Sequence, residues 1–376
     1  MEPDGRGAAV TGAARSVAAP PRHDGLTRLR LFLIGWVLLY HLDLTLRVTA
    51  GLSWLRPVLG VGYLGVDGFF VLSGFALWLG YAARPPRGGA GVRRFLLRRV
   101  AKIWPLHALA LAVLAAVVGS AAAAGVAIRS PERFGLSEFV LQLALVHAWE
   151  TTTHHAWNYP SWALSAEWAG YLAFPLLIRG LLRLPRAAVP PVPLLALAGL
   201  WILAGRTGTV GLNLTLHLGL LRFALEFALG LSLGRLATEG RLPRAFALAA
   251  TAALPAGVAL GDDALTVAGL AAVVVSLWRH GGAREAPARP DLLVRLGEAS
   301  FGVYLCWVFV EAALVGVLRL TDPGLGARVA LMTGGLLANL AGGWLAWRFV
   351  EVPAHRWILD RCAAAPPLGL SRSTGR

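Results

Sequence analysis

The chain is a succession of apolar segments about as long as a bilayer is thick, and this feature limits its possible folds more than any other. Hydrophobic residues make up 57% of the 376 residues, and charged residues only 15%. A helix needs roughly 20 apolar residues to cross the hydrocarbon core, and a soluble domain of this length would be less apolar. We therefore predict an all-α, multi-pass protein of the cell membrane.

About ten segments have the length and hydropathy of transmembrane helices. They cover residues 28–46, 61–83, 104–127, 162–178, 189–204, 212–234, 244–260, 264–278, 298–318 and 326–347. The apolar stretch 136–149 is short and carries Glu138, Gln142 and His147, so we interpret it as a re-entrant or interfacial segment. Most of the 35 lysines and arginines then lie on the side of both termini, which the positive-inside rule assigns to the cytoplasm.

The charge and the cysteines argue against two other classes of protein. A net charge of +15 could indicate nucleic acid, but the basic residues lie between apolar spans, so we expect membrane lipid and no nucleic acid as partner. Cys306 and Cys362 do not suggest a disulfide framework. We predict a disordered cytoplasmic tail at 1–25, a membrane domain at 26–358 and a cytoplasmic tail at 359–376, without a cleavable signal peptide.

Arg30 and His41 share one face of the first predicted helix. They are eleven positions apart, which is about three turns plus 20°, and roughly 16 Å along the axis. A ligand with an anionic head and a long thin arm, such as acyl-coenzyme A, would span this distance. Arg30 would then hold phosphates at the cytoplasmic mouth, and His41 would act as a general base on an acceptor hydroxyl. The alternative for His41 is a core histidine bonded to a neighbouring helix.

A second basic cluster enters the third span from the cytoplasmic side. Arg99 and Lys102 are three positions apart, so they are neighbours on one helical face. We predict that they hold the phosphates of the same ligand. An anchor that contacts anionic lipid is an equal alternative.

The segment 158–175 contributes a carboxylate near the outer side. Glu167 and Tyr171 are spaced i, i+4, and Glu167 could orient His41 or bind acceptor hydroxyls. A glutamate that reaches the interface is the alternative. Trp162 and the tryptophans near it are a platform for sugar rings or an interfacial belt.

Further charged residues lie inside or at the edge of the spans, where charge is costly and usually faces a cavity or a partner. Asp67 stands near the outer end of a glycine-rich helix and could pair with an arginine or with His41. Arg222 and Glu226 are spaced i, i+4 and could form a structural ion pair. Asp43 and Glu311 complete this set.

Several motifs in order resemble the acyltransferase 3 family of bacterial integral-membrane O-acyltransferases. The resemblance covers about residues 26–358. It consists of an arginine and a histidine separated by ten residues (Arg30 and His41), "GVDGFFVLSGF" (65–75), "RVAKIWPLH" (99–107), "WALSAEWAGY" (162–171), "RFALEFALG" (222–230), "SFGVYLCW" (300–307) and "EVP" (351–353). Each motif alone is weak, but the ordered series is specific.

The resemblance implies transfer of an acyl group, usually acetyl, from cytoplasmic acyl-coenzyme A to a hydroxyl of a carbohydrate-bearing acceptor. It implies a catalytic role for His41 and essential roles for Arg30 and Arg99. We take His41, Glu167 and Asp67 as candidate catalytic residues, and Arg30, Arg99 and Lys102 as candidate acyl-coenzyme A ligands. The candidate substrate-binding residues are Trp162, Tyr171, Arg222, Glu226 and Tyr304. We predict no metal site.

Four positions depart from the family pattern. Lys102 replaces a typical arginine, which turns a bidentate phosphate ligand into a point charge. Ala163 replaces a serine, His107 a tyrosine and Trp307 a histidine. The family often carries an extracytoplasmic hydrolase-like domain that relays the acyl group. We expect any relay here to need a separate extracytoplasmic protein.

Our first hypothesis is an acyltransferase acting on an envelope polysaccharide, a glycolipid or a glycosylated metabolite such as a macrolide. The alternative is a transporter or flippase of lipid-linked or acylated sugars, because buried ion pairs and glycine-interrupted helices also suit transporters. A transporter would not need the stripe from Arg30 to His41. A receptor without catalytic activity is a third reading, suggested by Trp307.

Overall fold

The computed structural model describes residues 23–128, 130–281 and 290–364, which form helices and loops without a strand. The ten longer helices are α1 (Asp24–Leu46), α4 (Gly65–Tyr81), α5 (Gly88–Ala123), α7 (Trp162–Arg183), α8 (Pro191–Thr207), α9 (Gly219–Thr238), α10 (Arg244–Leu260), α11 (Asp263–Gly281), α13 (Ser300–Leu320) and α14 (Leu325–Ala346). The shorter ones are α2 (Val48–Gly51), α3 (Arg56–Leu59), α6 (Leu136–Leu143), α12 (Leu292–Glu298) and α15 (Val352–Ala364). Most of the predicted tails, 1–22 and 365–376, lies outside the described residues.

Each of the ten predicted spans coincides with a long helix, and the chain is a multi-pass membrane protein. Seven helical stretches are long and apolar enough to cross a bilayer: Asp24–Leu46, Ser53–Tyr81, Gly88–Ala123, Arg186–Thr207, Asp263–Gly281, Ser300–Leu320 and Leu325–Cys362. Helices α7, α9 and α10 are outside this set: α7 and α9 carry charged residues within them, and α10 is only 17 residues long. The count of ten crossings and the cytoplasmic side of the termini stay predictions.

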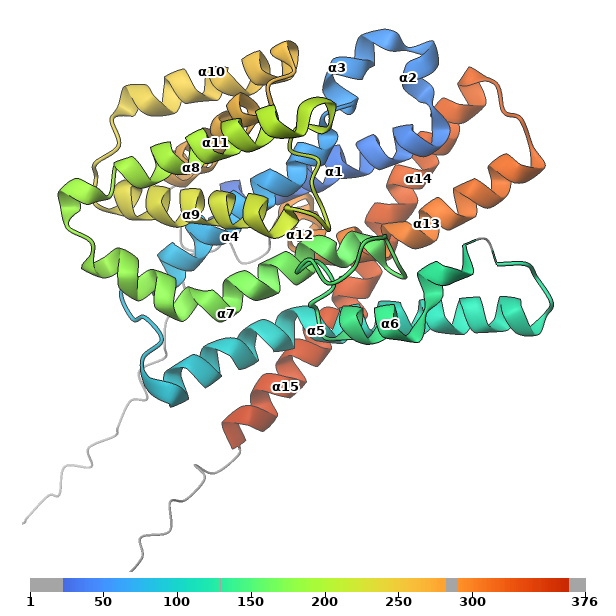
Figure 1. Ribbon diagram of the computed structural model, residues 1–376, viewed down its shortest axis with the longest axis horizontal. Coiled ribbons are helices and arrows are strands. Elements are labelled where there is room, and N and C mark those ends of the chain that lie inside the picture. Colours follow the sequence, from blue (N-terminus) through green and yellow to red (C-terminus); the bar gives the residue numbers. More distant parts are fainter. Residues whose placement is uncertain (1–22, 129, 282–289, 365–376) are drawn as a thin grey trace, which may run out of the picture.

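Helix α1 runs through the middle of the molecule (Figure 1). It packs against α4, α11, α12, α13 and α14. Its buried side chains therefore point in several directions: Leu33 contributes to one apolar cluster, Val37 to a second and Ile34 to a third. A helix surrounded on most sides is apolar around most of its circumference, which is why the polar residues on it stand out.

Helices α4 and α9 form the most extensive helix pair, and two glycines explain how closely they approach. A Cβ atom at Gly74 would collide with the carbonyl oxygen of Phe227, and one at Gly230 with the carbonyl oxygen of Val71. Small residues at such contacts let two backbones touch in a membrane protein. The glycine-rich pattern of α4 therefore reflects helix packing.

The segment 136–149 is an eight-residue helix, α6, followed by turns. Gln142 is fully bonded inside the protein. Its side chain donates from Nε2 to the Ala156 carbonyl (2.5 Å) and accepts from the Asn158 N–H (3.1 Å), and its backbone carbonyl oxygen lies 2.8 Å from Nε2 of His107. His147 lies 3.2 Å from the hydroxyl of Ser161. The segment is therefore folded back against the loop that follows it, and its position at the bilayer interface stays a prediction.

Candidate functional site

Two adjoining cavities lie along α1, one around each of the polar residues that α1 presents on one face. The Arg30 cavity has a volume of about 120 Å³ and includes Lys102, Glu167 and Tyr171 in its wall. The His41 cavity has a volume of about 230 Å³ and includes Tyr159 in its wall. Both residues of the predicted stripe thus face an internal space.

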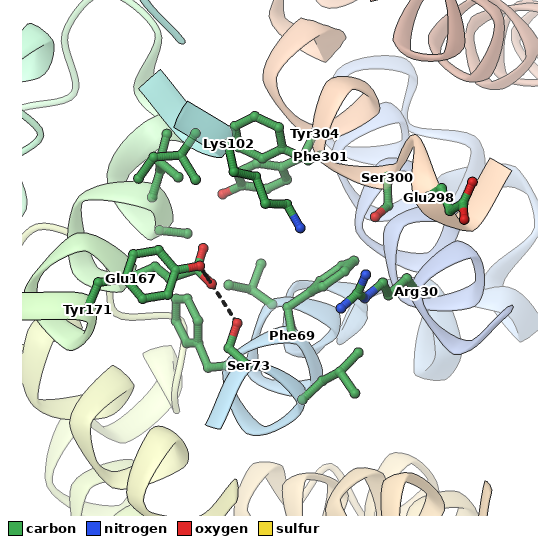
Figure 2. A pocket seen from close by; sticks show the side chains of 16 residues that line it. Arg30, Phe69, Ser73, Lys102, Glu167, Tyr171, Glu298, Ser300, Phe301 and Tyr304 are labelled. Carbon is green, nitrogen blue, oxygen red and sulfur yellow. Dashed lines mark hydrogen bonds between the residues drawn. The ribbon is translucent and has the colours of Figure 1, made fainter. Parts of the chain in front are cut away.

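The Arg30 cavity is lined by two cations, Arg30 and Lys102, and by two carboxylates, those of Glu167 and Glu298. Arg30 from α1 and Lys102 from α5 point into it from different walls (Figure 2). Within the part of the chain that the structure describes, neither forms an ion pair with a carboxylate. Because partly buried cations need compensation, the cavity is suited to an anionic ligand such as a phosphate.

Glu167 and Tyr171 form one wall of the Arg30 cavity. Oε1 of Glu167 accepts hydrogen bonds from Ser73 of α4 (2.5 Å) and from Tyr171, one turn further along α7 (2.6 Å) (Figure 2). These two bonds fix the carboxylate. His41 belongs to the other cavity. The structure places Glu167 against Ser73 and Tyr171 in the Arg30 cavity and His41 in the other one, and a role of Glu167 in orienting His41 stays a prediction.

Arg99 does not line the Arg30 cavity. Its guanidinium lies 5.6 Å from the ring centroids of Phe95 and Tyr171 and 5.9 Å from that of Tyr81, in cation–π range. Only Lys102 of the predicted pair enters the cavity. Arg99 stands behind Tyr171, so its expected contact with phosphates stays a prediction.

His41 is held by stacking. Its imidazole lies 4.3 Å from the ring centroid of Trp307 at an interplanar angle of 27°, and Tyr40 meets it edge-on at 5.0 Å. Among the described residues, no hydrogen-bond partner occupies either ring nitrogen. Trp307 thus packs directly on His41 and leaves its ring nitrogens free for a ligand in the cavity.

Asp67, Arg222 and Glu226 form a buried cluster beside the His41 cavity. Nε of Arg222 donates to Oδ1 of Asp67 (2.9 Å), Nη2 pairs with Oδ2, and Nη1 donates to the Leu214 carbonyl (2.9 Å). Glu226 Oε1 lies 3.5 Å from Nε, and neither of its oxygens has a hydrogen bond in the described structure. Of the two partners expected for Asp67, the structure shows the arginine.

Residues that the sequence analysis did not assign complete the His41 cavity. Glu311 accepts hydrogen bonds from Tyr159 (2.6 Å) and Thr45 (3.3 Å). Asn213 donates to the Tyr40 hydroxyl (3.0 Å). Glu311 was recognisable as an acid inside an apolar span, whereas Tyr159 and Asn213 lie in loops that carried no comparable signal.

Loops close the His41 cavity on the side of α6. The loop after α6 contributes Tyr159, and the loop before α9 contributes Asn213. Glu150 joins these loops by accepting from the His217 ring (2.8 Å) and the Leu218 N–H (2.6 Å). These two hydrogen bonds lower the pKa of the Glu150 carboxyl, so it is ionised at neutral pH.

Two of the predicted substrate-binding residues, Trp162 and Tyr304, line the cavities. Trp162 lines the His41 cavity, with the Arg222 guanidinium 5.5 Å from its ring centroid. Tyr304 lines both cavities and donates from its hydroxyl to the Pro160 carbonyl (2.6 Å). The predicted substrate residues are thus divided: Tyr171 faces the Arg30 cavity, and Trp162 and Arg222 face the His41 cavity.

Comparison with known proteins points to one enzyme class. A family model described as an acyltransferase domain matches residues 23–348. The acyltransferase MdmB of Streptomyces mycarofaciens is 37% identical over 130 residues, a match covering 33% of this chain and 30% of that protein. The exopolysaccharide production protein ExoZ of Rhizobium meliloti (strain 1021) is 31% identical over 314 residues, covering 79% of this chain and 90% of that protein. No solved structure matches significantly.

Proposed function

Because this chain belongs to the acyltransferase 3 family, we propose that it transfers an acetyl group from acetyl-coenzyme A to a hydroxyl of a carbohydrate-containing acceptor. The observation that carries this proposal is the pair of adjoining cavities on α1. One is lined by two cations that form no direct ion pair among the described residues, and the other holds an imidazole with open nitrogens.

The Arg30 cavity is the donor site. Arg30 and Lys102 line this cavity, and neither forms a direct ion pair among the described residues, so both can bind the phosphates of coenzyme A. His41 lies roughly 16 Å further along the same helix. The pantetheine arm covers this distance and brings the thioester towards His41.

The His41 cavity is the acceptor site. His41 takes the proton from the acceptor hydroxyl while the hydroxyl oxygen attacks the thioester carbonyl carbon. When the tetrahedral intermediate collapses, the carbon–sulfur bond breaks, the ester remains on the acceptor, and the coenzyme A sulfur leaves with the proton from His41. Glu311, Tyr159 and Asn213 surround this point with the polar and aromatic groups that sugar rings require.

The acceptor class rests on the relatives and on this lining. ExoZ is named for exopolysaccharide production, which supports a carbohydrate acceptor. An envelope polysaccharide, a glycolipid and a glycosylated metabolite such as a macrolide all present the required hydroxyl. Transfer is direct, or it passes through a separate extracytoplasmic relay protein.

The test combines a deletion strain with two single variants. Glycans, glycolipids and secreted metabolites of the deletion strain are compared with those of the wild type by mass spectrometry, and we expect one compound to lose 42 Da per site, an approximate acetyl increment, when the gene is absent. His41→Ala fails to restore it, because loss of a general base costs about 10²–10⁴-fold in rate. Unchanged acylation, with a lipid-linked sugar retained on one leaflet, would instead support a transporter.

Binding measurements separate donor from acceptor. Arg30→Ala removes a charge-assisted contact worth about 1.5–3 kcal/mol, so acetyl-coenzyme A binding to the purified protein weakens by roughly 10- to 100-fold, and the KM of the acceptor changes little. His41→Ala retains acetyl-coenzyme A binding and serves as the matched control for folding. Equal losses in donor and acceptor affinity for Arg30→Ala would contradict the donor site.

A further inference from the structure

Val66 and Tyr304 stand between the two cavities. Of the described residues, these two line both the Arg30 cavity and the His41 cavity. Val66 belongs to the first turn of α4, and Tyr304 to the second turn of α13. The partition is therefore formed by one side chain from each of two helices that flank α1.

Both side chains are fixed in place. The Tyr304 hydroxyl donates to the Pro160 carbonyl at 2.6 Å. Val66 is only 6% exposed, and the residue before it, Gly65, is pressed against α1, since a Cβ there would lie 2.7 Å from both the Leu33 carbonyl oxygen and a Val37 methyl. The first turn of α4 is therefore packed tightly on α1, and the buried Val66 side chain contributes to the width of the partition.

The reaction places the acyl group at this partition. If the phosphates lie with Arg30 and the acceptor hydroxyl lies with His41, the thioester carbonyl must sit where the cavities meet. The substituent on that carbonyl then competes for space with the Val66 methyl groups. Small cavities tolerate extra methylene groups poorly, because overpacking a close-packed interior forces side chains or backbone to move.

We propose that Val66 and Tyr304 form a gate between the donor and acceptor cavities, and that the size of residue 66 sets the longest acyl chain the protein accepts. This inference rests on the proposed function and adds the residue that selects among donors. It predicts a protein specific for short acyl groups, which a single substitution would convert to longer ones.

The experiment measures binding and therefore needs no acceptor. Acetyl- and butyryl-coenzyme A analogues in which a methylene group replaces the thioester sulfur are titrated against the full-length protein in nanodiscs by calorimetry. We expect the wild type to favour the acetyl analogue. Val66→Ala raises the ratio of butyryl to acetyl affinity by roughly tenfold, the scale of one methylene-sized fit in an apolar pocket, and Val66→Leu lowers it.

Val71→Ala is the matched control. Val71 lies on the same helix, is fully buried and belongs to an apolar cluster, and it lines neither cavity. It reports the effect of losing two buried methyl groups from α4, and its affinity ratio stays within about twofold of the wild type.

The outcomes separate the gate from the proposed function. An affinity ratio that is unchanged in both Val66→Ala and Val66→Leu, while both bind the acetyl analogue, overturns the gate and leaves the acyltransferase intact. A ratio that shifts equally in Val71→Ala also overturns it. A wild-type protein that binds neither analogue overturns the donor site itself, and the gate with it.

Discussion

Replacing Asp67 distinguishes a structural role from a chemical one. Asp67 and Arg222 are both 0% exposed, and the guanidinium makes two contacts with the carboxylate. Removing one partner of a buried ion pair costs about 3–5 kcal/mol, because the other charge is left uncompensated. In Asp67→Ala, Glu226 remains 3.5 Å from Nε of Arg222, so we expect a loss near the lower end, about 3 kcal/mol.

Arg222→Met is the more damaging change. It leaves two buried carboxylates, Asp67 and Glu226, without their common cation, and we expect a loss of about 5 kcal/mol. At about 2 °C per kcal/mol for a chain of this size, the apparent Tm falls by about 6 °C in Asp67→Ala and by about 10 °C in Arg222→Met. Asp67→Asn keeps the shape and one acceptor oxygen, so its Tm falls less than in Asp67→Ala.

The assay is thermal unfolding of the purified variants in one detergent, followed by acetyl-coenzyme A binding below the lowest Tm. A structural ion pair is supported if the fall in Tm is smallest in Asp67→Asn, larger in Asp67→Ala and largest in Arg222→Met. An Asp67→Ala protein that unfolds at the wild-type temperature would contradict a structural ion pair. If it also binds acetyl-coenzyme A normally but does not restore acylation in the deletion strain, Asp67 acts in the chemistry.

Two further predictions concern packing and the acceptor. Gly74→Ala places a Cβ against the Phe227 carbonyl, so we expect an overpacking cost of roughly 1–3 kcal/mol and a lower yield of folded protein. The control Gly80→Ala, on the same helix, meets no atom within 4 Å and retains the wild-type yield. Equal yields of the two variants by size-exclusion chromatography would contradict this. Glu311→Gln keeps an oxygen that can accept the Tyr159 hydrogen bond but removes the negative charge. We expect the KM for the carbohydrate substrate to rise roughly tenfold, while the KM for acetyl-coenzyme A is unchanged. A change in the acetyl-coenzyme A KM alone would contradict the placement of Glu311 at the carbohydrate site.

The first helix shows how far local periodicity can reach. Arg30 and His41 share a face of α1 whatever surrounds it, because helical geometry alone fixes their angle, and the structure places both on cavities. Asp43 is two positions beyond His41, about 200° around the helix, and it accepts hydrogen bonds from the Thr49 backbone N–H (2.8 Å) and hydroxyl (2.6 Å) after the helix end. Spacing along α1 places Asp43 away from the face of Arg30 and His41, but it does not show that Asp43 binds the turn after the helix.

The contacts between helices could not be predicted from the sequence. Glu167 was expected near His41 from its depth alone, but depth does not specify which neighbour a side chain faces, and Ser73 of α4 binds it in the Arg30 cavity. Arg99 and Lys102 share a helical face, yet the aromatic rings packed beside α5 hold Arg99 and leave Lys102 free to enter the cavity. Tertiary packing decided both cases.

A cryo-EM structure of the protein with the methylene-linked acetyl-coenzyme A analogue would show directly whether the donor lies along α1. We expect phosphates in contact with Arg30 and Lys102, a pantetheine arm that follows α1, and the acetyl carbonyl between Val66 and Tyr304 on the side open to His41. A nucleotide bound outside the Arg30 cavity, or an acetyl group separated from His41 by a closed wall, would contradict this placement of the donor.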